Sequence, residues 1–257
     1  MDIKKIFLVA LSMVFFMIGF MMSIVPSDQF VETGSIIGVS IISMPAFYGI
    51  WKIYSKQGIT AIIALGIFAL IIESIGIHTG FPYSPFEYTM PFGYKLLGTT
   101  PWTVFIAWSP LVFGAWILAQ RCFDYEWSRF LAYLGILVGT DSILDPGAVA
   151  RGLWEYTNAG LWFDVPLQNF VGWIISGTIA YLILKLVLRP VNINAKVSIS
   201  NSKQLWIGSL SLLLSIFLWS GVNAGYELWI PMIVGILLGN IIIQALFKIY
   251  ATNSSLK

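Results

Sequence analysis

Two carboxylates stand at helical spacing near the end of an apolar stretch, in the run DSILDPGAVARGLWEY that begins at Asp141. Asp141 and Asp145 are four residues apart, so on a helix they share one face with their Cβ atoms roughly 6 Å apart. Two acidic groups this close in a poorly hydrated setting cannot both ionise cheaply, and one should keep its proton near neutral pH. Glu73 is subject to the same desolvation. These three residues are predicted to be catalytic, with a protonated carboxyl serving as general acid.

Aromatic residues gather around the acidic pair. The chain has 11 Trp and 11 Tyr, and the interfacial belts of membrane proteins account for many of them. The residues that cluster with the acidic pair stand apart from these belts, and they are Arg151, Trp154, Tyr156, Trp162, Asn169 and Trp173. Aromatic faces attract cations and would stabilise a carbocation formed beside them. We therefore expect a carboxylic acid to protonate an alkene, after which a positioned water or the loss of a proton completes the reaction.

A purely structural interpretation of the acidic residues is the alternative. Asp145 precedes Pro146 and could belong to a helix-terminating signal, while a hydroxyl or Arg151 could satisfy Asp141. Intramembrane carboxylates are nevertheless functional hypotheses by default, although Glu73 lies near a helix end and could reach the interface. His78 is the only histidine and Cys122 the only cysteine. A transition-metal site is therefore not expected, and no metal ligand is predicted.

The elements that must position these residues are apolar runs. The chain is 58% hydrophobic and 10% charged, which is typical of an integral membrane protein and not of a soluble domain. Each run approaches the roughly 20 residues that a spanning helix needs. They lie at about 6–25, 34–54, 58–77, 101–119, 128–145, 167–188, 205–223 and 229–247. The predicted fold class is all-α, a polytopic transmembrane bundle of about eight helices, with seven as the competing count.

The basic residues predict an orientation in the cell membrane. If the runs alternate, almost all lie on one side, namely Lys4, Lys5, Lys52, Lys56, Arg121, Arg129, Lys185, Arg189, Lys196, Lys203, Lys248 and Lys257. Only Lys95 and Arg151 fall opposite. By the positive-inside rule both termini are expected to be cytoplasmic. The net charge of +2 comes from these loop flanks, so nucleic acid is not an expected partner.

Two outer segments lie on the side opposite most of the basic residues. Residues 78–100 and 146–166 are too irregular for helices and too apolar for solvated loops, so they are expected to be interfacial or re-entrant. Most other connections are short, which favours one integral membrane domain over residues 1–257. The predicted site region is 70–175.

Two other functions fit part of the pattern. A membrane terpene or carotenoid cyclase or prenyltransferase would use the aspartates to bind magnesium and diphosphate, but only Lys95 and Arg151 could help on this face. A proton-coupled transporter explains the acids but leaves the tryptophan-rich loop without a role. A retinal protein is set aside, because neither late helix has a lysine in its middle.

Several runs also carry a resemblance to a known family. ESIGIHTGFPYSPFEY, TPWTVFIAW, DSILDPGAVARGLWEY and VPLQNFVGW resemble the membrane carotenoid hydratases of the bisanhydrobacterioruberin hydratase and carotenoid 1',2'-hydratase group. The similarity covers roughly residues 70–175.

The resemblance implies a hydro-lyase that adds water to the terminal double bond of an acyclic carotenoid, without a cofactor. Its partners would be the lipophilic substrate and membrane lipid. Asp141, Asp145 and Glu73 match the acidic positions, and Trp154, Asn169 and Trp173 match the loop positions. The matching runs complete the predicted substrate-binding set, which is His78, Tyr83, Tyr88, Trp108, Arg151, Trp154, Tyr156, Asn169 and Trp173.

Overall fold

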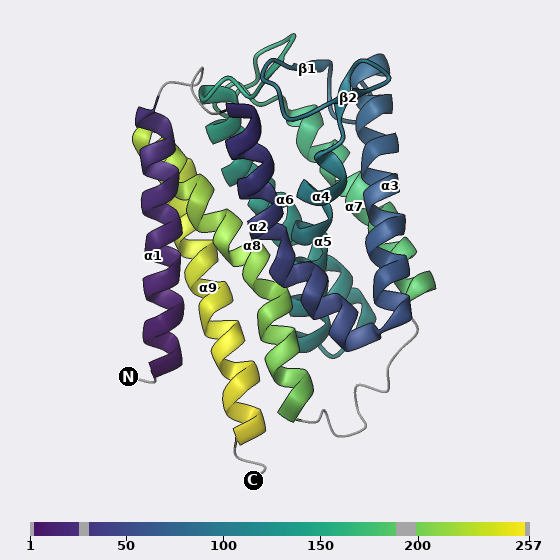
Figure 1. The fold of residues 1–257 in the computed structure, drawn as a ribbon, viewed down its shortest axis with the longest axis vertical. Coiled ribbons are helices and arrows are strands. Elements are labelled where there is room, and N and C mark those ends of the chain that lie inside the picture. The colour runs from purple at the N-terminus through teal and green to yellow at the C-terminus, as the bar shows by residue number, and fades with distance from the viewer. Residues whose placement is uncertain (1–2, 26–30, 189–198, 255–257) are drawn as a thin grey trace.

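The computed structural model describes residues 3–25, 31–188 and 199–254 and is a bundle of long helices (Figure 1). Each predicted apolar run is mainly helical, although the run at 101–119 contains two consecutive helices, and the all-α fold class is confirmed. The helices are α1 (Ile3–Ile24), α2 (Val31–Tyr54), α3 (Lys56–Thr79), α4 (Val104–Ala107), α5 (Ser109–Cys122), α6 (Glu126–Ala150), α7 (Leu167–Val187), α8 (Ile199–Gly225) and α9 (Trp229–Ser254).

Seven spans in the described residues are long and apolar enough to cross a membrane, with α4 and α5 forming one of them. The protein is therefore a multi-pass membrane protein. The long helix outside this set is α6, which also carries Glu126, Arg129, Asp141 and Asp145. These charged residues lower its mean hydropathy, and two of them, Asp141 and Asp145, are the residues that the sequence marks for chemistry.

Helix α8 is the central element of the bundle, with α1, α2, α5 and α9 packed around it. Small residues bring the backbones together, as in many membrane helix pairs. A Cβ atom on Gly221 would lie 1.9 Å from the Phe16 carbonyl oxygen of α1, and one on Gly49 of α2 would lie 2.4 Å from the Gly208 Cα atom. These two contacts leave no room for larger side chains, so they fix α1 and α2 against α8.

The course of α6 corrects one sequence interpretation. Pro146 does not end the helix, which continues to Ala150. A proline inside a helix leaves the carbonyl four residues earlier without its usual donor. Here the Trp162 indole N–H donates to the Ser142 carbonyl over 2.9 Å, and Asn223 donates to the adjacent Ile143 carbonyl over 2.8 Å. External donors thus stabilise α6 through the proline, and the outer loop begins later than expected.

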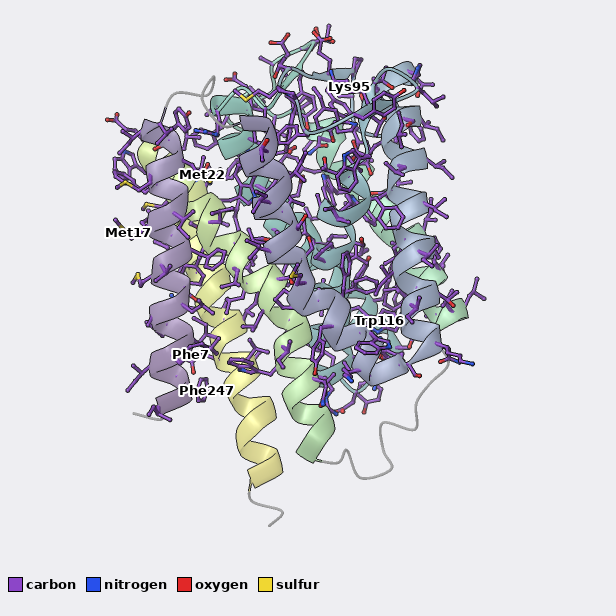
Figure 2. The ribbon with its side chains drawn as sticks, in the orientation of Figure 1. Phe7, Met17, Met22, Lys95, Trp116 and Phe247 are labelled. Carbon is purple, nitrogen blue, oxygen red and sulfur yellow. The ribbon has the colours of Figure 1, made fainter. Side chains whose placement is uncertain are left out.

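The two outer segments fold against each other. Strand β1 (Phe86–Tyr88) pairs antiparallel with β4 (Trp154–Tyr156), and β2 (Lys95–Leu96) pairs with β3 (Thr100–Pro101). Both segments were expected to be non-helical. Their first residues, 78–79 and 146–150, instead belong to α3 and α6, and the strands in the remainder were not anticipated. Lys95 lies at this end of the bundle, whereas Trp116 lies toward the opposite end (Figure 2). The start of α1 and the end of α9 also lie at the end away from the strands (Figure 1).

We expect Gly221→Val to destabilise the bundle, because the added side chain would force α1 away from α8 at a cost of about 1–3 kcal/mol. The measurement is the thermal unfolding midpoint of the purified protein in detergent. Gly135→Val is the matched control, since a Cβ atom at Gly135 meets no other atom within 4 Å. Equal midpoints for the two variants would contradict the close packing of α1 on α8.

Candidate functional site

The two aspartates of α6 are joined through one residue of α7. The side-chain nitrogen Nδ2 of Asn169 donates to Asp141 Oδ2 over 2.9 Å and to Asp145 Oδ2 over 2.6 Å. All three side chains are buried, with Asp141 completely inaccessible. The helical spacing of the aspartates thus presents both to a single amide, as the sequence predicts for one face. The other oxygen of Asp141, Oδ1, is buried without a hydrogen-bond partner in the described residues.

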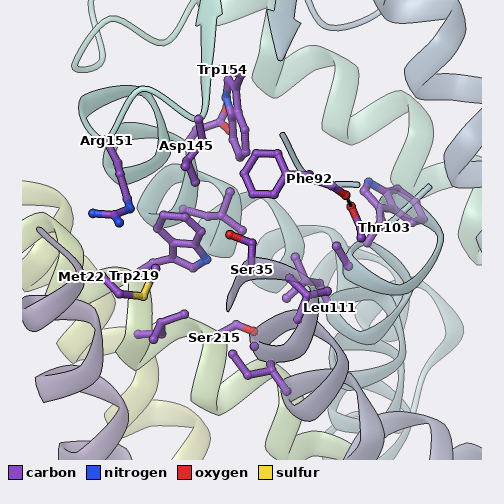
Figure 3. A pocket seen from close by; sticks show the side chains of 18 of the residues that line it. Met22, Ser35, Phe92, Thr103, Leu111, Asp145, Arg151, Trp154, Ser215 and Trp219 are labelled. Carbon is purple, nitrogen blue, oxygen red and sulfur yellow. Dashed lines mark hydrogen bonds between the residues drawn. The ribbon is translucent and has the colours of Figure 1, made fainter. Parts of the chain in front are cut away.

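Tyrosines hold the carboxyls that face the interior. Asp145 Oδ2 accepts a second hydrogen bond, from the Tyr156 hydroxyl over 2.7 Å. Glu73 is buried on α3, and its Oε2 atom accepts a longer hydrogen bond from the Tyr88 hydroxyl over 3.3 Å. The Trp154 side chain also lies beside Asp145 (Figure 3). Asp145 is therefore surrounded by donors, whereas Glu73 has one.

A cavity of about 1010 Å³ lies between the helices, and Asp145 and Glu73 line it. Asp141 does not line the cavity, although Asn169, which donates a hydrogen bond to it, does. Figure 3 shows Asp145, Trp154 and Phe92 together on one side of this space. Apart from the carboxyls, the wall is mainly aliphatic and aromatic. A carboxyl that reacts with a bound molecule must be Asp145 or Glu73, because only these two reach the cavity.

The antiparallel pairing of β1 and β4 places four aromatic rings over the carboxyls. Side chains alternate between the faces of a strand, and Phe86 lies opposite Tyr156 while Tyr88 lies opposite Trp154. These four residues line the cavity, and Glu87 and Glu155 project to the exposed face. The repeated pattern aromatic–Glu–aromatic in FEY and WEY thus builds an aromatic wall with an acidic exterior.

A second group of rings continues this wall at the ends of α3 and α7. Trp108 stacks on Trp173 with ring centroids 5.7 Å apart and planes 19° apart, and Tyr83 contacts Trp173 at 6.4 Å. Tyr83 fits because both neighbouring helices have a glycine there. A Cβ atom on Gly76 or on Gly172 would lie within 2.9 Å of the tyrosine ring. Trp108, Tyr83 and Trp173 therefore join the four strand residues around the same cavity.

The two loop tyrosines that hold carboxyls remain hydrogen-bond donors. Burial raises the pKa of the Tyr156 phenol well above its ordinary value, and the nearby Asp145 and Asp141 carboxyls raise this pKa further. Burial and the Glu73 carboxyl raise the pKa of Tyr88 in the same way. A phenol is protonated below its pKa, so both hydroxyls can donate to the carboxyls throughout the neutral range.

Three residues in or near the predicted cluster lie elsewhere or act differently. His78 is exposed on α3, where Nδ1 lies 2.7 Å from the Ser74 carbonyl, and it does not line the cavity. Arg151 lines the cavity but forms no ion pair within the described ranges, so it does not neutralise Asp141. Trp162 contacts the α6 backbone, as described above. Within the described residues, no three His, Cys, Asp or Glu side chains form a group that could hold a metal ion.

Part of the cavity wall was not anticipated from the sequence. Phe86, Phe92 and Trp219 line it together with residues of α1 and α2. The repeated aromatic residues of the segment PFEYTMPF were a signal for the first two. No sequence signal marked the residues of α1 and α2, because the apolar residue types that line such a cavity are the same types that face lipid.

Comparisons with known proteins identify the family of the chain. Residues 31–242 match the model of a family described as carotenoid biosynthesis protein. Bisanhydrobacterioruberin hydratase of Haloarcula japonica is 30% identical over 206 residues, which cover 79% of this chain and 68% of that protein. No solved structure matches the chain. Residues 31–242 contain both outer segments and every residue of the carboxyl site. On the basis of these two matches, the chain belongs to the carotenoid biosynthesis protein family.

Proposed function

We propose that the protein is a hydratase that adds water to the terminal carbon–carbon double bond of an acyclic carotenoid. The observation that carries the proposal is the buried Asp145, held by Asn169 and Tyr156 at one end of an aromatic-walled apolar cavity. The relative from Haloarcula japonica, a bisanhydrobacterioruberin hydratase, supports the same reaction class. The substrate and the mechanism below are inferred from the chemistry of these residues.

Asp145 is the proposed proton donor, because it lines the cavity and its Oδ2 atom already accepts two hydrogen bonds. Oδ1 is then the atom that can carry a proton toward the substrate. Once the proton leaves, the donors from Asn169 and Tyr156 stabilise the carboxylate without rearrangement, which strengthens the acid. Asp141 is proposed to stay neutral, since its Oδ1 atom has no partner to stabilise a charge.

The proposed reaction transfers the Asp145 proton to the less substituted alkene carbon and leaves a tertiary cation on the other. Trp154, Trp173 and Phe86 face the cavity and can stabilise this cation through their ring faces. Glu73, held by Tyr88, is the proposed base that positions a water. The water oxygen bonds to the cation, one of its protons passes to Glu73, and return of a proton to Asp145 restores the site. The net change is addition of one water.

The proposed orientation places both termini in the cytoplasm. Lys5, Lys52, Lys56, Arg121 and Lys185 lie toward the ends of helices away from the strands, in line with the positive-inside rule. The prediction from the sequence also counted Arg189, Lys196 and Lys257, which lie outside the described residues. The carboxyl site would then lie in the outer half of the membrane.

Expression in a host that accumulates lycopene should give a product heavier by one water, detected by mass spectrometry.

Asp145→Asn should lower product formation by at least about 100-fold, because an amide cannot supply the proton. Asp141→Asn should lower it less, since this residue does not reach the cavity. An isomer of unchanged mass would indicate cyclisation instead, and loss of wild-type activity on chelation would point to diphosphate chemistry. Full activity of Asp145→Asn would remove this residue from the mechanism.

Tyr156→Phe should lower the hydration rate about 10- to 100-fold, since a hydrogen bond to a charged group contributes about 1.5–3 kcal/mol. The variant keeps the ring in the cavity wall and removes only the hydroxyl that donates to Asp145. Initial rates in membranes of equal protein content measure the effect. Tyr94→Phe is the control, because Tyr94 is 77% exposed and lies outside the cavity wall. The idea fails if both variants retain the wild-type rate.

A further inference from the structure

The cavity has a second side that the carboxyl chemistry does not use. Away from Asp145, its wall consists of residues from α1 and α2, including Met13, Met17, Met21, Gly38 and Ile41. The four larger side chains are about half exposed, at 57%, 50%, 48% and 54% respectively. The carboxyl side is buried by comparison. The cavity is thus closed where the acids lie and open where the wall is aliphatic.

The opening lies between two helices that are consecutive in the chain but separate in space. In their described parts, α1 and α2 each pack along α8 and barely contact one another (Figure 1). Hydrogen bonds from α2 to two neighbouring helices fix it in place. Ser43 Oγ donates to the Ile106 carbonyl over 2.7 Å, and the Ala46 N–H donates to Ser211 Oγ over 2.9 Å. The packing of both helices on α8, together with the contact of α2 with α4, therefore maintains the gap.

Gly38 keeps this gap clear. It lines the cavity, and a Cβ atom built on it would meet no other atom within 4 Å. Glycine inside a helix costs roughly 0.5–1 kcal/mol relative to alanine. Gly49 of the same helix is explained by its close contact with Gly208 on α8. Gly38 has no such contact. What it provides is space on the cavity wall.

We infer that the gap between α1 and α2 is the binding site for the polyene tail of the substrate, which enters sideways from the hydrocarbon core with its reactive end toward Asp145 and Glu73. The identity of the ligand rests on the proposed hydratase function. An apolar wall open to hydrocarbon suits a long apolar chain, because no polar group must be desolvated along it. The one cation on the described cavity wall is Arg151, which belongs to the same end of the bundle as Asp145.

A retention experiment tests the site separately from catalysis. The full chain carrying Asp145→Asn is placed in lipid nanodiscs, loaded with lycopene and washed, and the bound polyene is measured by its visible absorbance. Adding Gly38→Phe should lower retention about tenfold, because the ring fills the gap. Adding Gly135→Phe should leave it unchanged. Gly135 also faces open space on a long helix, but it is not part of the cavity wall.

The outcomes separate the two proposals. Equal retention of lycopene by the Gly38→Phe and Gly135→Phe variants would contradict the proposed binding site. So would a parent Asp145→Asn chain that holds lipid acyl chains in the gap and no lycopene. Retention that is lost only with Gly38→Phe would establish the site even if the wild-type chain hydrated nothing, in which case only the hydratase proposal would fall. In the active wild-type background, Gly38→Phe should also raise KM for lycopene while changing kcat less, since the acids are untouched.

Discussion

The side-chain amide of Asn169 holds two buried carboxyls at once, and the geometry of the site depends on this contact. It links α7 to α6 at the end of the bundle that carries the strands, so the wall carrying Trp173 and the wall carrying the aspartates keep a fixed separation. Two neighbouring acids in an apolar setting would otherwise repel or draw in water. With the amide between them, one can remain neutral while the other faces the cavity.

The rest of the bundle supports this contact from both sides. At the opposite end of the same two helices, Lys185 Nζ lies 2.7 Å from Glu126 Oε1, which also accepts a hydrogen bond from Tyr181 over 3.0 Å. That ion pair is about half exposed and contributes little by itself, but it aligns α6 and α7 in the same register as Asn169. Donors from Trp162 and Asn223 then carry α6 past Pro146, so that Asp145 is inside a continuous helix rather than at a frayed end.

Hydropathy and spacing predict much of this protein because both are local properties. The apolar runs gave the helices, and the interval of four residues placed Asp141 and Asp145 on one face. The effect of Pro146 was misjudged because the Ser142 carbonyl, to which a proline cannot donate, accepts a hydrogen bond from Trp162 instead. Only the folded loop creates that contact. The strand pairing of Phe86 with Tyr156 was missed for the same reason, as it joins residues 70 positions apart. The distinction between Asp141 and Asp145 depends on which one reaches the cavity, and no pattern in the chain encodes that.

A cavity that is closed at the acids and open to hydrocarbon between α1 and α2 has a consequence for molecules with two equivalent ends. Under the proposed function, only the end beside Asp145 can react during one binding event. The second end of a symmetric polyene remains in the bilayer. To react there, the molecule must leave the cavity, turn end for end in the bilayer and bind again with its second end toward Asp145. The enzyme would therefore be distributive, and the order of its products would be set by competition between the half-modified and the unmodified chain for one opening.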